Sequence, residues 1–176
     1  MLLSHNEIIQ LCTDGVVEGW KDTAVNSASL DIHLGDKIMV ATDSDHIVDY
    51  RKREALSMMT FAMDEGGMLL RPNDFILAHS VEVFHLPMDV SAEYKLKSSM
   101  ARIGLDHCNA GWADAGWHGS VLTLEFKNLS HQTIRLRPGD AIGQMIFFRH
   151  APVELDQSYA VRGRYNNHKQ VSGIVK

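Results

Sequence analysis

Short runs of alternating apolar and polar residues are the feature that most constrains how this chain folds. The run 29–34 alternates strictly and ends at Gly35, and similar runs follow at 37–40, 67–70, 75–84, 92–96, 121–126, 133–136 and 142–148. Turn-forming sequences such as Pro72-Asn73-Asp74 and Pro138-Gly139-Asp140 separate them, as expected where a chain reverses between strands. The pattern predicts a mainly β fold, a distorted jelly roll or β-barrel, rather than alternating strands and helices.

Few helices are expected, and they should be short. Ser4 and Glu7 fit a capping box before an apolar stretch, and Gly15 is a natural stop, so a helix should open the chain. Residues 51–63 fit either a loop or a short helix. From about residue 157 the chain is polar and loses its alternation, which is typical of a mobile C-terminal arm. At this length we predict one domain over residues 1–176.

The charge balance argues against a nucleic-acid-binding surface. The chain has 17 Lys and Arg against 22 Asp and Glu, a formal net charge of -5, and no long basic run. Its two cysteines, Cys12 and Cys108, form no disulfide framework and are interpreted as reduced thiols. No apolar run approaches the roughly 20 residues that span a bilayer. We expect a cytoplasmic protein (in the host cytoplasm if it is viral) that binds neither nucleic acid nor membrane.

Positive charge gathers locally in the segment 97–102, Lys-Ser-Ser-Met-Ala-Arg. Two hydroxyls and two cations lie where a short helical turn can begin. Free backbone N–H groups there, together with Lys97 and Arg102, form a candidate cradle for a polyphosphate. The ordinary alternative is a helix N-cap followed by a surface arginine.

Two isolated carboxylates follow that segment. Glu125 interrupts the apolar run 121–126 and shares a strand face with Thr123, whereas Leu124 points to the opposite face. A carboxylate in such a strand is either solvated or buried for a purpose. Asp114 lies in the glycine-rich stretch 111–116, where it serves either an Asx-type turn or chemistry.

Together, these segments resemble the deoxycytidine triphosphate (dCTP) deaminases of the trimeric deoxyuridine triphosphatase (dUTPase) superfamily. The resemblance runs from about residue 26 to 165 and is densest over 97–125. It implies a dUTPase-like fold and a homotrimer whose sites are built across subunit boundaries. The implied reaction is hydrolytic deamination of dCTP to dUTP, alone or followed by hydrolysis to dUMP and pyrophosphate. Thymidine triphosphate (dTTP) is a candidate feedback inhibitor.

The resemblance also implies roles for individual residues. Glu125 matches the general base of these enzymes, Ser98 and Arg102 match residues near the catalytic water, and Asp114 matches a sugar-binding and water-activating aspartate. The other implied substrate contacts are Lys97, Ser99, Asn109, Ala110, Gly111, Trp112, Gln144, Tyr159, Arg164, Tyr165 and His168.

Some positions depart from the family pattern. Lys97 stands where arginine is more usual and lacks the bidentate fork of a guanidinium group. Asn109 takes the place of a threonine, and His168 that of a glutamine. Gly111-Trp112 replaces a bulkier polar pair of the single-function enzymes, which favours the type that continues to dUMP, because a small residue lets the chain approach the substrate.

Zinc, which most nucleobase deaminases use, is not expected here. His107 and Cys108 are adjacent, but no Cys-x-x-Cys completes a site. Glu125 would then take the proton from water and deliver it to N3 of the base. Magnesium is implied only through the triphosphate, with no protein side chain as its ligand.

Two other functions stay open. One is a pure dUTPase, although such an enzyme has no need of a carboxylate at position 125. The other is a catalytically silent nucleotide-binding regulator, against which the intact set Ser98, Arg102, Asp114 and Glu125 argues.

Overall fold

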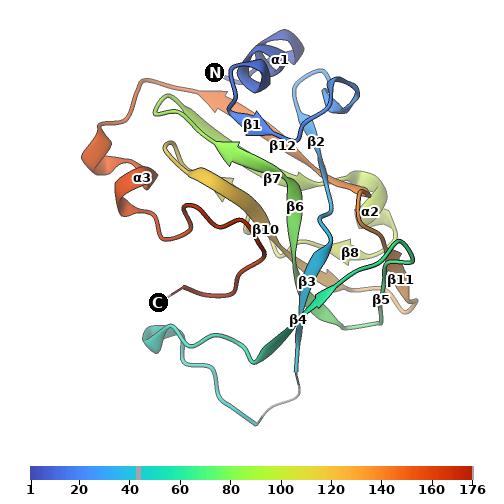
Figure 1. Cartoon of the computed structure of the whole chain (residues 1–176). Helices are drawn as coiled ribbons and strands as arrows, with labels where there is room; N and C mark the ends of the chain where they lie inside the picture. The colour runs from blue at the N-terminus through green and yellow to red at the C-terminus, as the bar shows by residue number, and fades with distance from the viewer. Residues whose placement is uncertain (43–44, 176) are drawn as a thin grey trace.

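Antiparallel pairing organises the computed structural model, which describes residues 1–42 and 45–175 (Figure 1). One sheet has the strand order β4-β3-β6-β10-β8, with β1 also paired to β6; a second has the order β2-β12-β7-β9; and β11 pairs with β5. The strands are β1 (Val17–Glu18), β2 (Leu30–His33), β3 (Lys37–Ala41), β4 (Met58–Ala62), β5 (Met68–Leu70), β6 (Phe75–His85), β7 (Val90–Leu96), β8 (Leu105–Asp106), β9 (Trp112–Ala113), β10 (His118–Asn128), β11 (Ile134–Leu136) and β12 (Ala141–Arg149).

The helical elements are few and short, as the sequence predicts. They are α1 (His5–Thr13), α2 (Ser98–Arg102) and α3 (Tyr159–Arg162), with 3-10 turns η1 (Asp22–Ala24), η2 (Tyr50–Lys52) and η3 (Leu155–Gln157). The capping box at α1 is confirmed, because the Glu7 carboxylate accepts hydrogen bonds from the Ser4 backbone N–H at 2.8 Å and the Ser4 hydroxyl at 2.7 Å. None of the helices in the described residues is long and apolar enough to cross a membrane.

The mainly β fold is confirmed, but the region 51–63 differs from the expected loop or short helix. It begins within η2 and continues into β4, an edge strand that pairs with β3. Most β4 side chains are exposed. Because an edge strand buries neither face strongly, its sequence shows no alternation by which it can be recognised.

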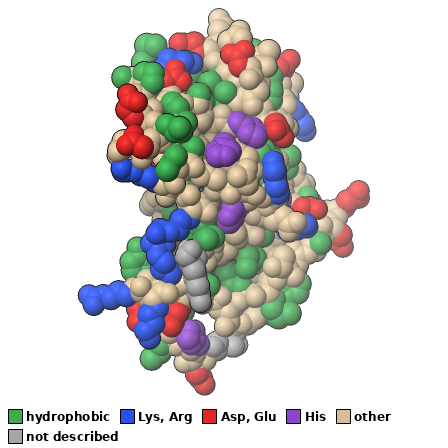
Figure 2. Space-filling model, turned by 60° about the vertical axis from the view of Figure 1, so that its left-hand side comes forward, with side chains coloured by type: hydrophobic (Ala, Val, Ile, Leu, Met, Phe, Trp, Pro, Cys, Tyr) green, Lys and Arg blue, Asp and Glu red, His purple; other side chains and the backbone are tan. Residues whose placement is uncertain are grey.

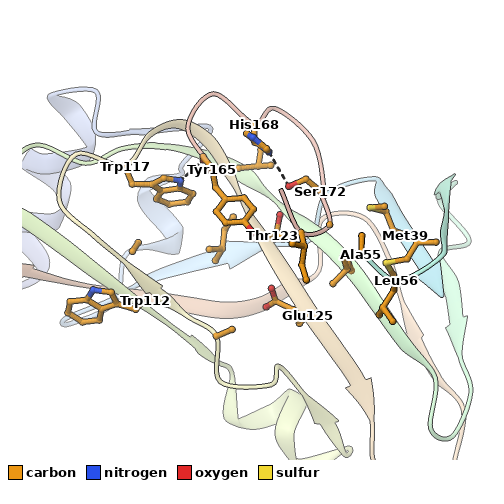
Figure 3. Close-up of a pocket in the computed structure, with 18 of the residues that line it drawn as sticks. Met39, Ala55, Leu56, Trp112, Trp117, Thr123, Glu125, Tyr165, His168 and Ser172 are labelled. Carbon is orange, nitrogen blue, oxygen red and sulfur yellow. Dashed lines mark hydrogen bonds between the residues drawn. The ribbon is translucent and has the colours of Figure 1, made fainter. Parts of the chain in front are cut away.

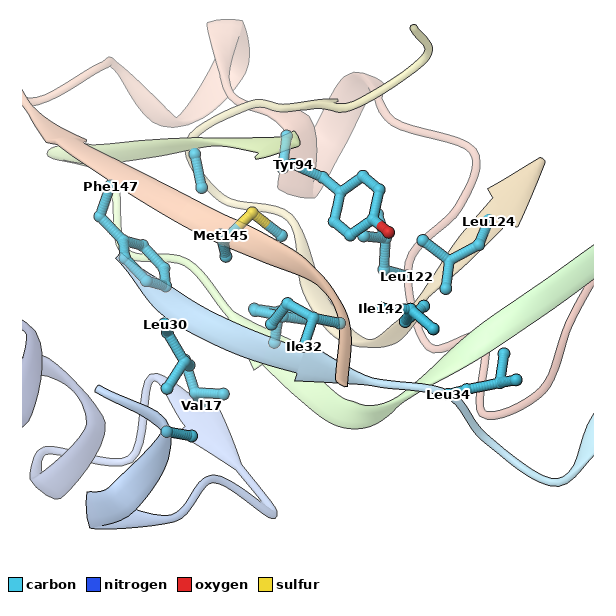
Figure 4. Close-up of a cluster of buried hydrophobic side chains, with 14 of the residues drawn as sticks. Val17, Leu30, Ile32, Leu34, Tyr94, Leu122, Leu124, Ile142, Met145 and Phe147 are labelled. Carbon is cyan, nitrogen blue, oxygen red and sulfur yellow. The ribbon is translucent and has the colours of Figure 1, made fainter. Parts of the chain in front are cut away.

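The core lies between the two main sheets (Figure 4). Tyr94 and Phe147 are among its largest buried side chains, and Leu122 and Leu124 reach it from β10. Each apolar side chain that is fully removed from water contributes about 1.5–3 kcal/mol. Since alternate residues of β10 face this core, Glu125 is directed to the other face of its sheet, as the strand pattern predicts.

A tyrosine packs directly over a glycine within the second sheet. Tyr94 on β7 is 2% exposed, and a Cβ built on Gly143 of β12 would lie 2.0 Å from its ring. Any side chain at position 143 would therefore overlap the ring. Among the described residues the Tyr94 hydroxyl has no hydrogen-bond partner.

The C-terminal arm, expected to be mobile, lies alongside β10 in the structure. The Tyr165 carbonyl accepts hydrogen bonds from the Trp117 indole at 2.9 Å and the Ser120 hydroxyl at 2.7 Å. Further along, the Val121 N–H donates to the His168 carbonyl at 2.9 Å. The arm is thus bound to the sheet by its backbone, and its mobility stays a prediction.

The surface mixes charge of both signs with apolar side chains (Figure 2). On the face shown, acidic and basic groups are interspersed rather than separated by sign. Several large apolar side chains are exposed on the described chain, among them Met59, Phe61, Leu69, Ile103 and Trp112. Clusters of exposed apolar residues are typical of protein contact surfaces.

Candidate functional site

A cavity of about 500 Å³ lies on the outer face of the six-stranded sheet, around Glu125 (Figure 3). Its walls come from β3, β6 and β10, from the loop around 110–117, from residues 55–58 and from the C-terminal arm. Figure 3 shows the Glu125 carboxylate pointing into the space beneath the arm. The cavity therefore collects side chains from parts of the chain that are far apart in sequence.

Glu125 is the titratable group best adapted to proton transfer in this cavity. Burial raises its pKa from 4.5 to about 7, and a backbone hydrogen bond only partly opposes the shift. A group with this pKa is populated in both protonation states at neutral pH. Glu125 is therefore able to accept a proton and return it within one reaction cycle.

Aromatic side chains form the wall beneath the arm. Trp117 stacks on Phe84 with ring centroids 5.4 Å apart, and its indole N–H donates a hydrogen bond to the Tyr165 carbonyl. Tyr159 also lines the cavity, and burial raises the pKa of its phenol. The arm residue His168 lines it too, with its imidazole Nδ1 3.1 Å from the Ser172 hydroxyl. The predicted arm residues Tyr159, Tyr165 and His168 thus share one cavity with Glu125.

Asp114 lies at the mouth of the same cavity. Its exposed carboxylate accepts a hydrogen bond from the Trp112 indole N–H at 2.8 Å. The turn itself is closed by the backbone, because the Trp117 N–H donates to the Asp114 carbonyl at 3.2 Å. The Trp112 ring, 60% exposed, stacks on Phe148. The carboxylate is therefore oriented by an indole and stays open to the cavity.

The loop before Asp114 requires glycine at position 111 for a reason that sequence analysis missed. The Tyr94 N–H donates to the Gly111 carbonyl at 2.7 Å, and a Cβ at Gly111 would lie 2.4 Å from the Tyr94 carbonyl oxygen. Strand β7 therefore leaves no room for a side chain at position 111. Ala110 lines the cavity, whereas Asn109 is exposed, with a left-handed φ of 55° that asparagine tolerates.

The segment predicted to bind phosphates lies outside the cavity. Ser98, Ser99 and Arg102 are exposed on α2, a helix of only five residues that begins after Lys97. Arg164, on the arm, is also exposed and does not line the cavity. Within a single chain, the expected phosphate contacts and Glu125 are therefore not brought together.

Lys97 and Gln144 meet instead at Asp31, a residue of β2. The Asp31 carboxylate accepts hydrogen bonds from the Lys97 ammonium, from the Asn26 amide at 2.8 Å and from the Gln144 amide at 3.2 Å. Burial opposes ionisation of Asp31, but these bonds outweigh it and keep the pKa of the carboxyl below its usual value. These two predicted substrate contacts thus donate hydrogen bonds to one carboxylate.

Across residues 1–42 and 45–175, no group of three or more His, Cys, Asp or Glu side chains is arranged to hold a metal ion. His107 is buried edge-on to the Tyr94 ring, with centroids 5.3 Å apart, and burial lowers the pKa of its imidazole. Cys108 is exposed. The adjacent pair therefore faces in different directions.

Comparison with known proteins identifies relatives over most of the chain. The family described as dCTP deaminase-like matches residues 2–150. A Methanosphaerula palustris protein named "dCTP deaminase, dUMP-forming" is 32% identical over 157 residues, 89% of this chain and 84% of the relative. A protein of the same name from Aquifex aeolicus is 33% identical over 174 residues, 97% of this chain and 92% of the relative.

Solved structures support the fold. The 2'-deoxycytidine 5'-triphosphate deaminase from Agrobacterium tumefaciens aligns with a TM-score of 0.66 at 23% identity and covers 85% of this chain. The alignment spans 48% of that protein, so this chain matches about half of its length. A dUTPase from Streptococcus mutans aligns with a TM-score of 0.51 at 14% identity, over 77% of this chain and 88% of the dUTPase. The predicted dUTPase-like fold is therefore confirmed.

Proposed function

Because this chain belongs to the dCTP deaminase-like family, we propose that it is a hydrolase that deaminates dCTP, with Glu125 moving the proton. One observation carries the assignment to this residue: Glu125 lines a cavity in which burial raises its pKa to about 7. A pure dUTPase would gain nothing from a desolvated carboxylate at this position. A silent regulator would gain nothing from one tuned to neutral pH.

The proposed reaction requires one group that accepts a proton and then donates it. As water attacks C4 of cytosine, Glu125 takes a proton from the water and delivers it to N3. A C4–O bond forms; Glu125 then moves the proton of the new C4 hydroxyl to the amino group, the C4–N4 bond breaks, and ammonia leaves as the C4 carbonyl of dUTP forms. Ser98 and Arg102 would position the water, and the backbone around Ala110 would face the base.

We further propose that the chain continues to dUMP and pyrophosphate, as the names of the relatives indicate for those proteins. Asp114 lines the same cavity as Glu125, and its carboxylate is exposed. That arrangement suits a base for attack of water on the α-phosphorus. One cavity would then serve both steps.

Magnesium fits this reaction as an ion carried by the triphosphate. Asp31, the acidic residue beside Lys97, already accepts three hydrogen bonds, and no acidic cluster occurs elsewhere in the described residues. Magnesium favours phosphate oxygens and retained waters over such a site. When bound, it would neutralise charge on the phosphates.

A homotrimer would bring the separated parts of the site together. Glu125 lines a cavity, whereas Ser98, Ser99 and Arg102 are exposed on α2 outside it. If the α2 of a neighbouring subunit faces the cavity, phosphate contacts and proton transfer meet in one site. The same site would accept dTTP as a feedback inhibitor. The trimer would act in the cytoplasm, in the part of nucleotide metabolism that leads to dUMP and dTTP.

Separating the products of a reaction started with dCTP and magnesium tests the proposed function. We expect ammonia, dUMP and pyrophosphate without free dUTP. Asp114→Asn should still release ammonia but stop at dUTP, because only the second step needs its carboxylate. Accumulation of dUTP by the unmodified protein would contradict the second step alone. Absence of ammonia would contradict deamination itself.

A further inference from the structure

The cavity around Glu125 has two unlike halves. One half is polar and aromatic, with Trp112, Tyr165 and His168 among its side chains. The other half, here called the apolar half, consists of Met39, Ala55, Leu56, Met58, Phe75 and Leu77. Figure 3 shows Met39, Ala55 and Leu56 on the far side of Glu125 from Trp112.

Strand register fixes the apolar half on one flank of Glu125. Glu125 on β10 lies opposite Leu77 on β6, and Leu77 lies opposite Met39 on β3, so the three form one row on the outer face of the sheet. On the other side of β10 runs β8, from which the chain continues to Ala110. Glu125 therefore stands between a loop with backbone polar groups and a wall of hydrocarbon.

A cytosine placed for deamination has a defined orientation between these flanks. Its C4 must face Glu125, and the ring neighbours of C4 are N3 and C5. N3 accepts a proton and needs polar surroundings, whereas C5 carries only hydrogen. The C5 edge is therefore matched to the apolar half. The side chains of that half have no polar group that could bind a phosphate or a sugar hydroxyl. The space beyond C5 is therefore lined by hydrocarbon.

We propose that the apolar half receives an alkyl group on C5 of the base, so that the substrates include 5-methyl-dCTP as well as dCTP. The inference rests on the proposed deamination. Its chemistry is unchanged: oxygen from water bonds to C4, the C4–N4 bond breaks, ammonia leaves and the methyl group is untouched. The product of this step is thymidine triphosphate.

The first experiment compares the two nucleotides with the full-length assembled protein. Burial of one methyl group is worth about 0.8 kcal/mol, or roughly fourfold in affinity. We therefore expect kcat/KM for 5-methyl-dCTP to equal that for dCTP or exceed it by up to about fourfold. A ratio below about one-tenth would overturn the inference, since such a loss is typical of a methyl group that does not fit.

Filling the apolar half tests where the methyl group lies. Met39 is only partly buried, so Met39→Trp should fold and occupy the space opposite Leu77. We expect the ratio of kcat/KM for 5-methyl-dCTP over dCTP to fall by about tenfold or more. Met59→Trp is the matched control, because Met59 lies on neighbouring β4, is 55% exposed and does not line the cavity. Equal ratios in the two variants would overturn the assignment.

A second variant, with the opposite expected effect, keeps the inference testable if Met39→Trp does not fold. Leu56 is 45% exposed, and Leu56→Ala widens the apolar half. It should raise the use of 5-propynyl-dCTP relative to dCTP by about threefold or more, as one or two freed methylenes allow. An unchanged ratio would contradict the inference.

Calorimetry with Glu125→Gln separates the two ways in which the proposals can fail. The variant should bind 5-methyl-dCTP as tightly as dCTP. Binding of dCTP alone means that something else, such as a segment of a neighbouring copy, fills the apolar half, and only the inference is lost. Binding of neither nucleotide, with no ammonia released by the unmodified protein, overturns the proposed function as well.

Discussion

The surroundings of Glu125 and of α2 represent two opposite ways of presenting polar groups. Glu125 stands in a cavity lined by strands, loops and the C-terminal arm, and burial shifts the pKa of its carboxyl to about 7. The hydroxyls and guanidinium of α2 are exposed on a five-residue helix outside that cavity. One region is completed by its own chain, whereas the other is left open.

The difference shows which parts of the chemistry a single chain prepares in advance. A proton-transferring group must be desolvated before the substrate arrives, because desolvation sets its pKa. Phosphate-binding groups work while hydrated and need only be within reach. The roles proposed for Glu125 and α2 follow this division, and each experiment below tests one part of it.

Replacing the desolvated carboxylate should have the largest effect. Glu125→Gln removes the proposed proton carrier, so we expect kcat for ammonia release to fall by about 10²–10⁴-fold or more. Nucleotide affinity, measured by calorimetry, should change little. Lys127→Gln is the control, because Lys127 shares the strand and face but does not line the cavity. Near-normal turnover in Glu125→Gln would remove Glu125 from the mechanism.

A mixing experiment tests whether α2 of one copy contributes to the cavity around Glu125 of another copy. Arg102→Ala should lower activity by about 10²-fold, as removal of one charged donor from a reacting site does, and should weaken binding. If the two regions meet between chains, co-refolding Arg102→Ala with inactive Glu125→Gln should restore part of the activity. If Arg102 and Glu125 of the same chain form each site, no site in the mixture contains both groups, and mixing should restore no activity.

Removing the arm should have a smaller effect, confined to substrate capture. Truncation after Gln157 deletes Tyr159 and Tyr165 from the cavity, along with the basic residue Arg164. We expect KM for dCTP to rise by about 10–100-fold, the range of one or two hydrogen bonds to a charged group. Circular dichroism and sedimentation should show an unchanged fold and assembly. Unaltered kinetics would mean that the arm covers the cavity without contributing to binding.

The smallest effect should appear in thermal stability. Since the pKa of Glu125 is raised from 4.5 to about 7, the stability associated with its protonated form is present at low pH and lost as pH rises through 7. Glu125→Gln has no such titration. The Tm of Glu125→Gln minus that of the unmodified protein should therefore increase by a few degrees from pH 5 to pH 8.5, because 1 kcal/mol corresponds to about 2–4 °C in a chain of this size. Parallel Tm curves would mean that Glu125 titrates as an exposed acid.

Sequence reasoning succeeded where burial imposes a pattern on neighbouring residues. The long strands β10 and β12 were predicted because their buried positions alternate over most of their length. Strand β6, which buries five consecutive residues, was predicted as a mainly apolar run between turn sequences. Strand β4 was missed, because most of its side chains are exposed, and β1, β8 and β9 were missed because two residues cannot display a period.

The same limit applies to the site. Glu125 is recognisable because one charge in an apolar strand is unusual. The bond between Asp31 and Lys97 joins residues 66 positions apart and leaves no local signal. Gly111 is predicted to contact the substrate, but its close approach to the Tyr94 carbonyl was not foreseen. Contacts between distant segments decide these roles, and no sequence window contains both partners.

The packing of Tyr94 on Gly143 has a consequence for how this protein is able to evolve. A side chain at position 143 cannot be added while the ring remains, because the first new carbon would lie 2.0 Å from it. Loss of the ring alone would leave a void in the sheet that costs several kcal/mol. Neither substitution is tolerated first, so in descendants of this chain the two positions change together or not at all.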